Sequence, residues 1–407
     1  MIPPLPGERW TVVAEEEVLP ADAGCRVDHR GLLLAALDAG VAVQLLVPTP
    51  RPLDVDAYAA LLPGVDVLAL PRDRRHRRQL SPRPFVVTSR PIPGDLVPAV
   101  AAHAPTAVLA MSVRVAHLGL HLAGALRLPL MVRCQNLDSA YFRDLATGAR
   151  RLRRAAYLVE SVRLARFERS LDADPRITAF SDVSAVEAEQ HRGRTSTPVV
   201  HVPVFALPPD AIPALGTRPA GPDRAGVVFV GSLDVETNQR ALDWFLSRVW
   251  PQVRATAPTA TLAVVGRRPP DTLRARLGTL VSQGVSVYAD VPDVLPYLLA
   301  AAVAVNPVRT GTGINVKLLQ SVLAGCASVS TTVGASGLDW RDGRDLLVAD
   351  SPPDFAASVL TLLADPARRD RLAAAGAALV ADRLDPQRCV LSLAEALRPA
   401  QAPQSAR

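Results

Sequence analysis

The sequence predicts an α/β protein with two doubly wound domains, each built on a parallel sheet. Three observations support this prediction. Short apolar runs alternate with longer segments of helical period, which is the pattern of strand–helix–strand units. The alternation stops over residues 205–226, which are rich in Pro, Gly and Ala, and then restarts. The chain has 407 residues, of which 49% are hydrophobic, so it can bury more than one core.

In the first half, the apolar runs predict the strands of one sheet. These runs are TVVA (11–14), VAVQLLV (41–47), VDVLAL (65–70), TAVLAM (106–111), LPLMVR (128–133), ITAF (177–180) and PVVHV (198–202). Between them, residues 28–39, 113–126 and roughly 139–171 have a helical period. We therefore predict a first domain over residues 1–204 and a linker over residues 205–226.

The second half repeats the alternation and predicts a second domain over residues 227–384. Its apolar runs are VVFVG (227–231), TLAVVG (261–266), VSVYA (285–289), VAVNP (303–307), ASVST (327–331) and LLVA (346–349). The predicted helices are 242–253, 271–282, 314–324, 354–364 and 367–381. A last helix, 386–398, lies in a closing segment 385–407 that ends in a flexible-looking tail. Because ligands bind at the carboxyl ends of parallel strands, we expect both domains to face a central cleft.

The basic charge is concentrated in two segments of the first half. The net charge is +6, while residues 72–83 and 143–169 each carry a net +5. Two basic patches on an otherwise nearly neutral chain favour a docking surface such as an anionic membrane. The alternative is that both segments are solvated helix faces. The basic segments lack interleaved aromatic residues, so we expect no nucleic-acid binding.

Other compositional features bear on the compartment. No run of apolar residues is long enough for a transmembrane helix, and the first residues lack the pattern of a signal peptide. The four cysteines, Cys25, Cys134, Cys326 and Cys389, form neither a CxxC pair nor a dense disulfide framework. We therefore expect a cytoplasmic protein.

The most informative stretch is VAVNPVRTGTGINVKLLQSVLAG, residues 303–325. A strand that ends at Asn306 is followed by a loop with Gly311, Thr312 and Gly313, and then by a helix that starts near Ile314 or Asn315. Glycines allow close backbone approach, and the amides at a helix start favour a phosphate group. Lys317, which is the only lysine among 45 basic residues, lies in the first turn of this helix. We predict that Lys317 and Arg309 supply positive charge to this phosphate site and that Gln320 lies on the same helix face.

Three further turns at strand ends are weaker candidates. Gly24 and Arg26 lie in a predicted tight turn between the first strand and the first helix. Gly231 and Ser232 end the first strand of the second domain, and Asn238 follows at the start of a helix. Gly266 and Arg267 end the next strand. None of these turns is the GxGxxG motif of a dinucleotide site.

No motif predicts a metal site. His117 and His121 are spaced to share one helix face, but no acidic partner follows at ligand spacing. We expect these histidines to pack or to face solvent, and we expect no metal and no other cofactor.

The second half, over about residues 226–385, resembles the retaining, nucleotide-sugar-dependent glycosyltransferases of family 4, which have the GT-B fold. The resemblance rests on several segments in the expected order. They are FVGSLDVETNQRALDWFLSRVWPQV, VVGRRPP, VPDVLPYL, NPVRTGTGINVKLLQSVLAG and STTVGASGLDWRDGRDLLVADSPPDFA. The first half matches more loosely, in residues 22–26, in VRCQNLDSAYF (132–142), in the long Arg-rich helix and in ITAFSDVSA (177–185).

The chain departs from the pattern of this family at five positions. Thr312 and Gln320 occupy the positions of a Glu pair, so the chain resembles a branch that lacks the first Glu. Ser232 and Asn238 replace a basic pair, and Gln135 replaces a common His. Gln320 retains the capacity to hydrogen-bond a ribose hydroxyl.

The resemblance implies a hexosyltransferase-type glycosyltransferase that transfers a sugar from a nucleotide diphosphate sugar to an acceptor with retention. The donor side would include Gly231, Ser232, Gly266, Arg267, Asn315 and Gln320 with the Gly311–Gly313 loop. The acceptor side would include Gly24, Arg26, Gln135 and Asn136. The acceptor would be a lipid-linked or envelope glycan precursor of polysaccharide biosynthesis, or a small molecule, and the enzyme would sit at the inner face of the membrane. The alternative is a non-catalytic GT-B protein that binds a nucleotide sugar or a partner enzyme.

Overall fold

The computed structural model describes residues 5–19, 24–73, 81–147, 151–205, 224–291, 294–310 and 314–398. Most of the predicted linker and the Gly311–Gly313 loop lie outside these residues. The chain divides into two compact units, Met1–Pro209 with Asp385–Arg407, and Asp210–Leu384. The closing helix thus belongs to the first unit.

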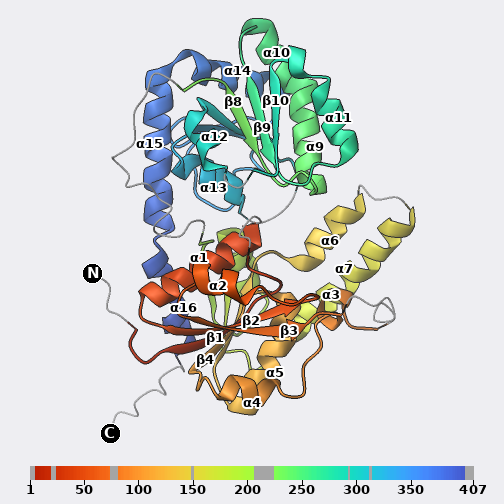
Figure 1. Cartoon of the computed structure of the whole chain (residues 1–407), viewed down its shortest axis with the longest axis vertical. Helices are drawn as coiled ribbons and strands as arrows, with labels where there is room; N and C mark the ends of the chain where they lie inside the picture. The colour runs from red at the N-terminus through yellow and green to blue at the C-terminus, as the bar shows by residue number, and fades with distance from the viewer. Residues whose placement is uncertain are drawn as a thin grey trace. The chain divides into compact units, whose positions relative to one another are not determined.

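The first unit is built on a seven-stranded parallel sheet in the order β3-β2-β1-β4-β5-β6-β7 (Figure 1). Its strands are β1 (Arg9–Val13), β2 (Ala42–Thr49), β3 (Val65–Pro71), β4 (Ala107–Ala110), β5 (Leu130–Cys134), β6 (Ala179–Asp182) and β7 (Val199–His201). All seven predicted strands are confirmed. Buried parallel strands form continuous apolar runs, which made them visible in the sequence.

Helices connect these strands and differ in places from the predicted ones. The helices are α1 (Gly24–Asp38), α2 (Val55–Leu61), α3 (Phe85–Thr88), α4 (Leu96–Ala101), the 3₁₀ turn η2 (Val113–Val115), α5 (Ala116–Leu126), α6 (Asp138–Thr147), α7 (Arg151–Asp172), α8 (Ala185–Arg192) and α16 (Pro386–Leu397). The long predicted helix is two helices, α6 and α7, which pack against each other (Figure 1). The predicted tight turn at Gly24–Arg26 is wrong, because these residues form the first turn of α1.

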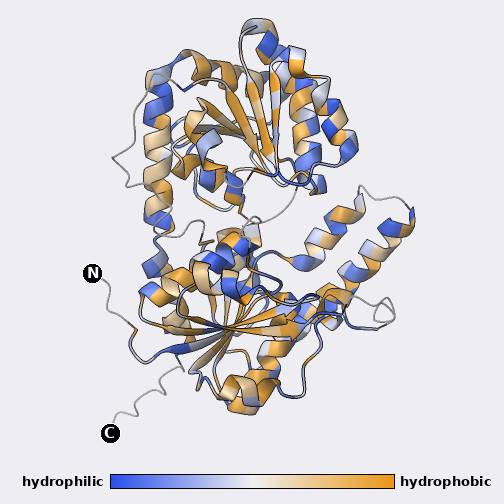
Figure 2. Ribbon diagram, in the orientation of Figure 1, coloured by the Kyte–Doolittle hydropathy of each residue, from blue (hydrophilic) through white to orange (hydrophobic). Residues whose placement is uncertain are grey.

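Two clusters of buried apolar residues form the core around the first sheet, and Figure 2 shows that its strands consist mainly of hydrophobic residues. On one face, α1 and α16 pack together, and α16 contributes Val390, Leu393, Ala394 and Leu397 to the core. Residue Gly31 in α1 allows the chain at Phe205 to approach, since a Cβ there would lie 2.5 Å from the Phe205 carbonyl oxygen. The last helix is therefore a structural part of the first unit.

The second unit has a six-stranded parallel sheet in the order β10-β9-β8-β11-β12-β13. Its strands are β8 (Val227–Val230), β9 (Leu262–Gly266), β10 (Val285–Ala289), β11 (Val303–Asn306), β12 (Ala327–Ser330) and β13 (Leu347–Val348). Each strand was predicted within a few residues. The two sheets, each with helices, confirm the predicted fold class of two doubly wound α/β domains.

The helices of the second unit are α9 (Glu236–Trp244), the π-helical turn η4 (Phe245–Val249), α10 (Trp250–Thr256), α11 (Asp271–Gly278), the 3₁₀ turn η5 (Val281–Gln283), α12 (Leu295–Ala300), α13 (Val316–Leu323), α14 (Pro352–Ala364) and α15 (Pro366–Arg383). The predicted helix 242–253 spans the end of α9, η4 and most of α10. Residues Phe245, Trp250 and Phe355 pack at its centre. Within the described part of the chain, no helix combines the length and the apolar character needed to cross a bilayer.

Candidate functional site

The strand order of the second unit places its candidate residues at one edge of the sheet. The chain runs outward from β8 through β9 to β10, then returns to β11 on the other side of β8. Such a reversal leaves a crevice at the carboxyl ends of the two central strands, where doubly wound folds bind ligands. The loops that follow β8, β9 and β11 carry most of the residues predicted for the donor side.

Lys317 lies in the first turn of α13 and is partly buried. Its ammonium group donates a hydrogen bond to Asn238 Oδ1 in α9, and it lies 6.0 Å from the centroid of the Phe229 ring. No ion pair joins Lys317 to a carboxylate among the described residues. Burial lowers the pKa of Lys317 to about 8. The amine is therefore held in an environment that favours an added anion.

The loops after β8 and β9 are packed tightly against each other. A Cβ on Gly266 would lie 2.2 Å from the Gly231 carbonyl oxygen, so only glycine fits there. Arg267 Nε donates to Ser232 Oγ at 2.9 Å. Asn238 Nδ2 donates to the Ser232 carbonyl oxygen at 2.9 Å, which links these loops to Lys317. The structure thus brings Gly231, Ser232, Gly266, Arg267 and Lys317 into one cluster, although their segments are far apart in sequence.

The start of α13 lacks a side-chain cap among the described residues. Asn315 is the N-cap residue, but its side chain donates to the Gly334 carbonyl oxygen at 3.1 Å. Asn306 donates to the same oxygen at 2.9 Å, and its buried Oδ1 has no hydrogen-bond partner within the described parts of the chain. First-turn amides without a side-chain cap attract anions. This feature supports the predicted phosphate site.

The remaining donor-side residues are less closely joined to the cluster. Arg309 is exposed, and its guanidinium carbon lies 5.2 Å from the centroid of the Trp244 ring in α9. Gln320 is half-buried, one turn beyond Lys317 in α13. Gly311, Thr312 and Gly313 lie outside the described residues.

The predicted acceptor-side residues lie in the first unit and are held by local partners. Arg26 Nε donates to Glu16 Oε1 at 3.0 Å. Gln135 Nε2 donates a hydrogen bond to the buried carboxylate of Asp28. This bond ties the Gln135 side chain to α1. Asn136 lines a pocket that also contacts Cys134 and Asp182, the last residues of β5 and β6. Gly24 is the first residue of α1, the helix that follows β1 in the chain.

A buried charge cluster at the end of β1 was not predicted. Arg114 NH1 lies 3.3 Å from Glu15 Oε1, and Arg114 NH2 lies 2.6 Å from Asp138 Oδ1. Burial alone would raise the pKa of Glu15, but Arg114 and Arg90 outweigh it and lower that pKa to about 2. Burial also lowers the pKa of the neighbouring His29, which keeps its imidazole neutral. This cluster fixes the start of α1 and α6 rather than offering a free charge.

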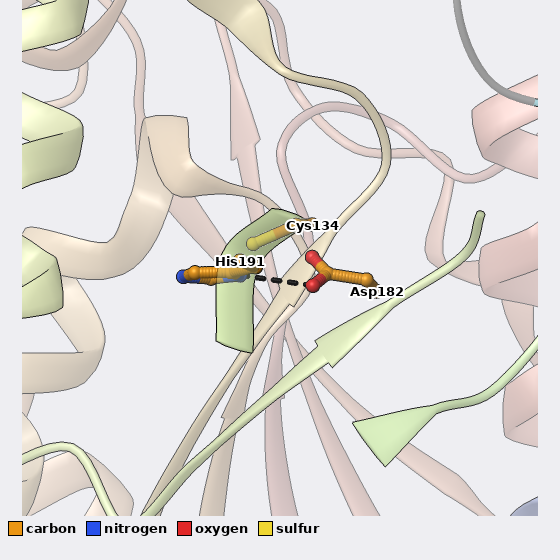
Figure 3. Close-up of side chains that lie close together, drawn as sticks. All are labelled: Cys134, Asp182 and His191. Carbon is orange, nitrogen blue, oxygen red and sulfur yellow. Dashed lines mark hydrogen bonds and ion pairs between the residues drawn. The ribbon is translucent and has the colours of Figure 1, made fainter. Parts of the chain in front are cut away.

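The two histidines that share a helix face have different surroundings. His117 Nε2 lies 2.7 Å from the Arg90 carbonyl oxygen, and His121 is exposed. A different group, Cys134, Asp182 and His191, brings three metal-ligating side chains together (Figure 3). Only the residue types were visible in the sequence, because the three residues come from different elements: Cys134 from β5, Asp182 from β6 and His191 from α8.

The architecture of two Rossmann-like parallel sheets is that of the GT-B fold. The structure of the Anabaena protein HepE in complex with UDP and glucose is similar, with a TM-score of 0.61 and 14% identity over 96% of this chain and 99% of that chain. At this identity the similarity establishes the fold alone. The GT-B fold expected from the resemblance is therefore confirmed.

The family-model match falls in the second unit, and two relatives match about a third of the chain. Residues 224–365 match the family model of glycosyl transferases group 1. A Corynebacterium glutamicum protein, the GDP-mannose-dependent monoacylated alpha-(1-6)-phosphatidylinositol monomannoside mannosyltransferase, is 35% identical over 145 residues, which are 33% of this chain and 38% of that protein. An uncharacterized 44.6 kDa protein in the cps region of Klebsiella pneumoniae is 24% identical over 33% of this chain and 36% of its own length. The aligned part thus spans little more than a third of either relative.

Proposed function

We propose that this protein is a glycosyltransferase that uses a nucleotide diphosphate sugar as donor. The observation that carries the proposal is Lys317, whose partly buried ammonium lies at the uncapped start of α13 beside the glycine loops of β8 and β9. The family match covers this part of the chain, and HepE is described in complex with UDP. Anion-binding amides together with a cation suit a diphosphate better than either feature alone.

The proposed chemistry is transfer with retention of configuration. The bond between the anomeric carbon and the diphosphate breaks, and the acceptor oxygen bonds to that carbon on the same face. The acceptor proton passes to the departing phosphate oxygen. Lys317, Arg309 and the amides of α13 stabilise the growing charge of the diphosphate. No carboxylate is assigned as a base, and no metal is needed for these steps.

The affinity for a nucleoside diphosphate is expected to fall as the pH rises above about 8. Burial lowers the pKa of Lys317 to about 8, so its charge is present below that pH and is lost above it. The diphosphate is fully ionised above about pH 8, because the last proton of a phosphate group dissociates at about pH 6. The affinity should fall up to about tenfold per pH unit. Calorimetric titration between pH 7 and pH 9.5 measures this, and a Lys317→Ala variant should show a flat profile.

We further propose that the acceptor is a lipid-linked or envelope glycan precursor met at an anionic membrane surface. Helix α7 supports this proposal, because Leu152, Leu158, Val159 and Val162 are exposed on it. Exposed arginines lie on the same helix, including Arg151 and Arg154. Apolar and basic side chains together on one exposed helix suit an interfacial helix. The alternative is a soluble small-molecule acceptor.

Leu152→Glu is expected to release the protein from vesicles that contain anionic lipid. Leu152 is 90% exposed, so the substitution should leave the fold intact. Co-sedimentation at low salt measures binding, with Val281→Glu as the matched control, since Val281 is 65% exposed in the second unit. Equal sedimentation of both variants and the wild type would contradict membrane docking through α7 and favour a soluble acceptor.

The direct test of the donor is a thermal-shift screen against UDP, GDP, ADP, dTDP and their common sugars. Saturation at one hundred times Kd adds about 2.7 kcal/mol of stability. A shift with one base, followed by release of that nucleotide from its sugar in the presence of acceptors, supports the proposal. A shift without turnover under any acceptor supports a non-catalytic nucleotide-sugar-binding protein. No shift with any nucleotide contradicts the donor site.

A further inference from the structure

A group of three side chains with different donor atoms lies in the first unit, apart from the donor cluster. Cys134 ends β5, Asp182 ends β6, and these two residues are direct neighbours in the parallel register. His191, in α8, reaches back to them (Figure 3). The sulfur, a carboxylate oxygen and a ring nitrogen all lie within 4.8 Å of one another. All three residues are buried, at 8%, 2% and 4% exposure.

The imidazole of His191 is fixed from both sides. Its Nδ1 lies 2.9 Å from Asp182 Oδ2, on the side of Cys134. Its Nε2 lies 2.9 Å from Asp172 Oδ1, at the end of α7. A carboxylate on the outer nitrogen is the usual partner of a metal-binding histidine, since it fixes the ring and its tautomer. Asp172 is therefore placed as such a partner, and Nδ1 is turned toward the other two donors.

We propose that Cys134 Sγ, an oxygen of Asp182 and His191 Nδ1 form a binding site for a zinc-type divalent ion, with Asp172 orienting the imidazole. Sulfur, imidazole nitrogen and carboxylate oxygen are the ligands of Zn²⁺ in proteins, whereas Mg²⁺ and Ca²⁺ take oxygen ligands. Zinc sites with three protein ligands keep a fourth position for water. The pocket beside the cluster is lined by both apolar and polar side chains, and the polar ones include Asn136, Glu168 and Arg194.

The charges of the cluster allow a zinc ion to replace two protons. An imidazole that faces carboxylates from both nitrogens is the imidazolium, and the thiol beside it is protonated. Binding one Zn²⁺ displaces the proton on His191 Nδ1 and the proton on Cys134 Sγ, and both pass to solvent. Two positive charges enter and two leave, so the net charge of the cluster does not change. Without an ion, the same residues form a hydrogen-bonded clamp between β6, α7 and α8. The experiment below distinguishes this clamp from a metal site.

The test uses the full-length protein after treatment with EDTA. Dialysis against Zn²⁺ and metal analysis should give one bound ion per chain. Titration with Cd²⁺ should produce a thiolate-to-metal charge-transfer band in the ultraviolet. Both signals should be absent in Cys134→Ser and unchanged in Cys25→Ser, because Cys25 is a half-buried free thiol of the same unit. These readouts do not depend on transferase activity, so the site and the proposed function succeed or fail separately.

Asp172→Asn supplies a second, milder variant in case Cys134→Ser does not fold. Loss of an outer carboxylate typically weakens metal binding about 10- to 100-fold. The proposal predicts this loss with the cadmium band still present, because the sulfur ligand remains. No cadmium–thiolate band in the wild type, or equal zinc content in the wild type and Cys134→Ser, would overturn the site and leave the hydrogen-bonded clamp.

Discussion

Lys317→Ala is expected to lower the rate of sugar transfer about 100- to 1,000-fold, which is the usual effect of removing one group that stabilises developing negative charge. The expectation follows from the position of the ammonium in the first turn of α13, where its only hydrogen-bond partner among the described residues is Asn238. The initial rate of nucleoside diphosphate release, measured with the donor found in the screen, gives kcat and KM. Loss should appear in kcat at saturating donor as well as in affinity.

The stability of the Lys317→Ala variant separates a functional role from a structural one. Burial lowers the pKa of this amine, so the folded protein holds the charged form at a cost. Removing the amine should therefore leave Tm unchanged or raise it. Arg248→Ala is a matched control, because Arg248 is an exposed cation of the same unit. Transfer at a near-native rate in Lys317→Ala would show that the diphosphate is bound elsewhere.

Much of the fold was predictable because most of its strands are buried on both faces. A parallel strand that is buried on both faces is mostly apolar, and β8 (Val227–Val230) is apolar and buried throughout. Helix ends were less predictable. The residues Gly24, Cys25 and Arg26 look like a turn, yet they belong to α1, where Arg26 pairs with Glu16. A local pattern does not show such a tertiary partner.

The candidate site was predictable only where its chemistry is local. Lys317, Asn315 and the strand that ends at Asn306 lie within one segment, so spacing identified them. The bond between Lys317 and Asn238 joins residues 79 positions apart, and the sequence pointed to Asn238 only as a helix-capping residue and as a departure from the family pattern. The cluster of Cys134, Asp182 and His191 was missed for the same reason, since strand register brings Cys134 beside Asp182 and the fold of α8 brings His191 to them.

The buried pair Arg133–Asp28 is another long-range contact, and its loss is expected to have the largest effect on stability. The two residues lie 105 positions apart and are 1% and 0% exposed. Arg133 donates to both oxygens of Asp28, at 2.9 and 2.8 Å. Its other donors reach Ser181 Oγ and the carbonyl oxygens of Val202 and Pro203. This one side chain therefore ties α1 and β5 to β6 and to the segment that follows β7.

Arg133→Met is expected to lower the free energy of unfolding by about 3–5 kcal/mol, because it leaves a buried carboxylate without its counter-charge. Urea unfolding followed by circular dichroism measures the loss. Arg176→Met is the control, since Arg176 forms an exposed pair with Asp174 at 2.6 Å, and such pairs contribute less than about 1 kcal/mol. Equal losses in the two variants would contradict the role assigned to the buried pair.

The pH dependence of this loss gives a sharper test. Burial alone would raise the pKa of Asp28, but Arg133 outweighs it and lowers that pKa. The stabilisation is therefore present above the pKa of an unfolded Asp, about 4, and is lost as the pH falls below it. In Arg133→Met, burial acts unopposed by the guanidinium and raises the pKa of Asp28. The difference between wild type and variant should thus be largest near neutral pH and should shrink toward pH 3, whereas a loss caused only by altered packing would stay constant.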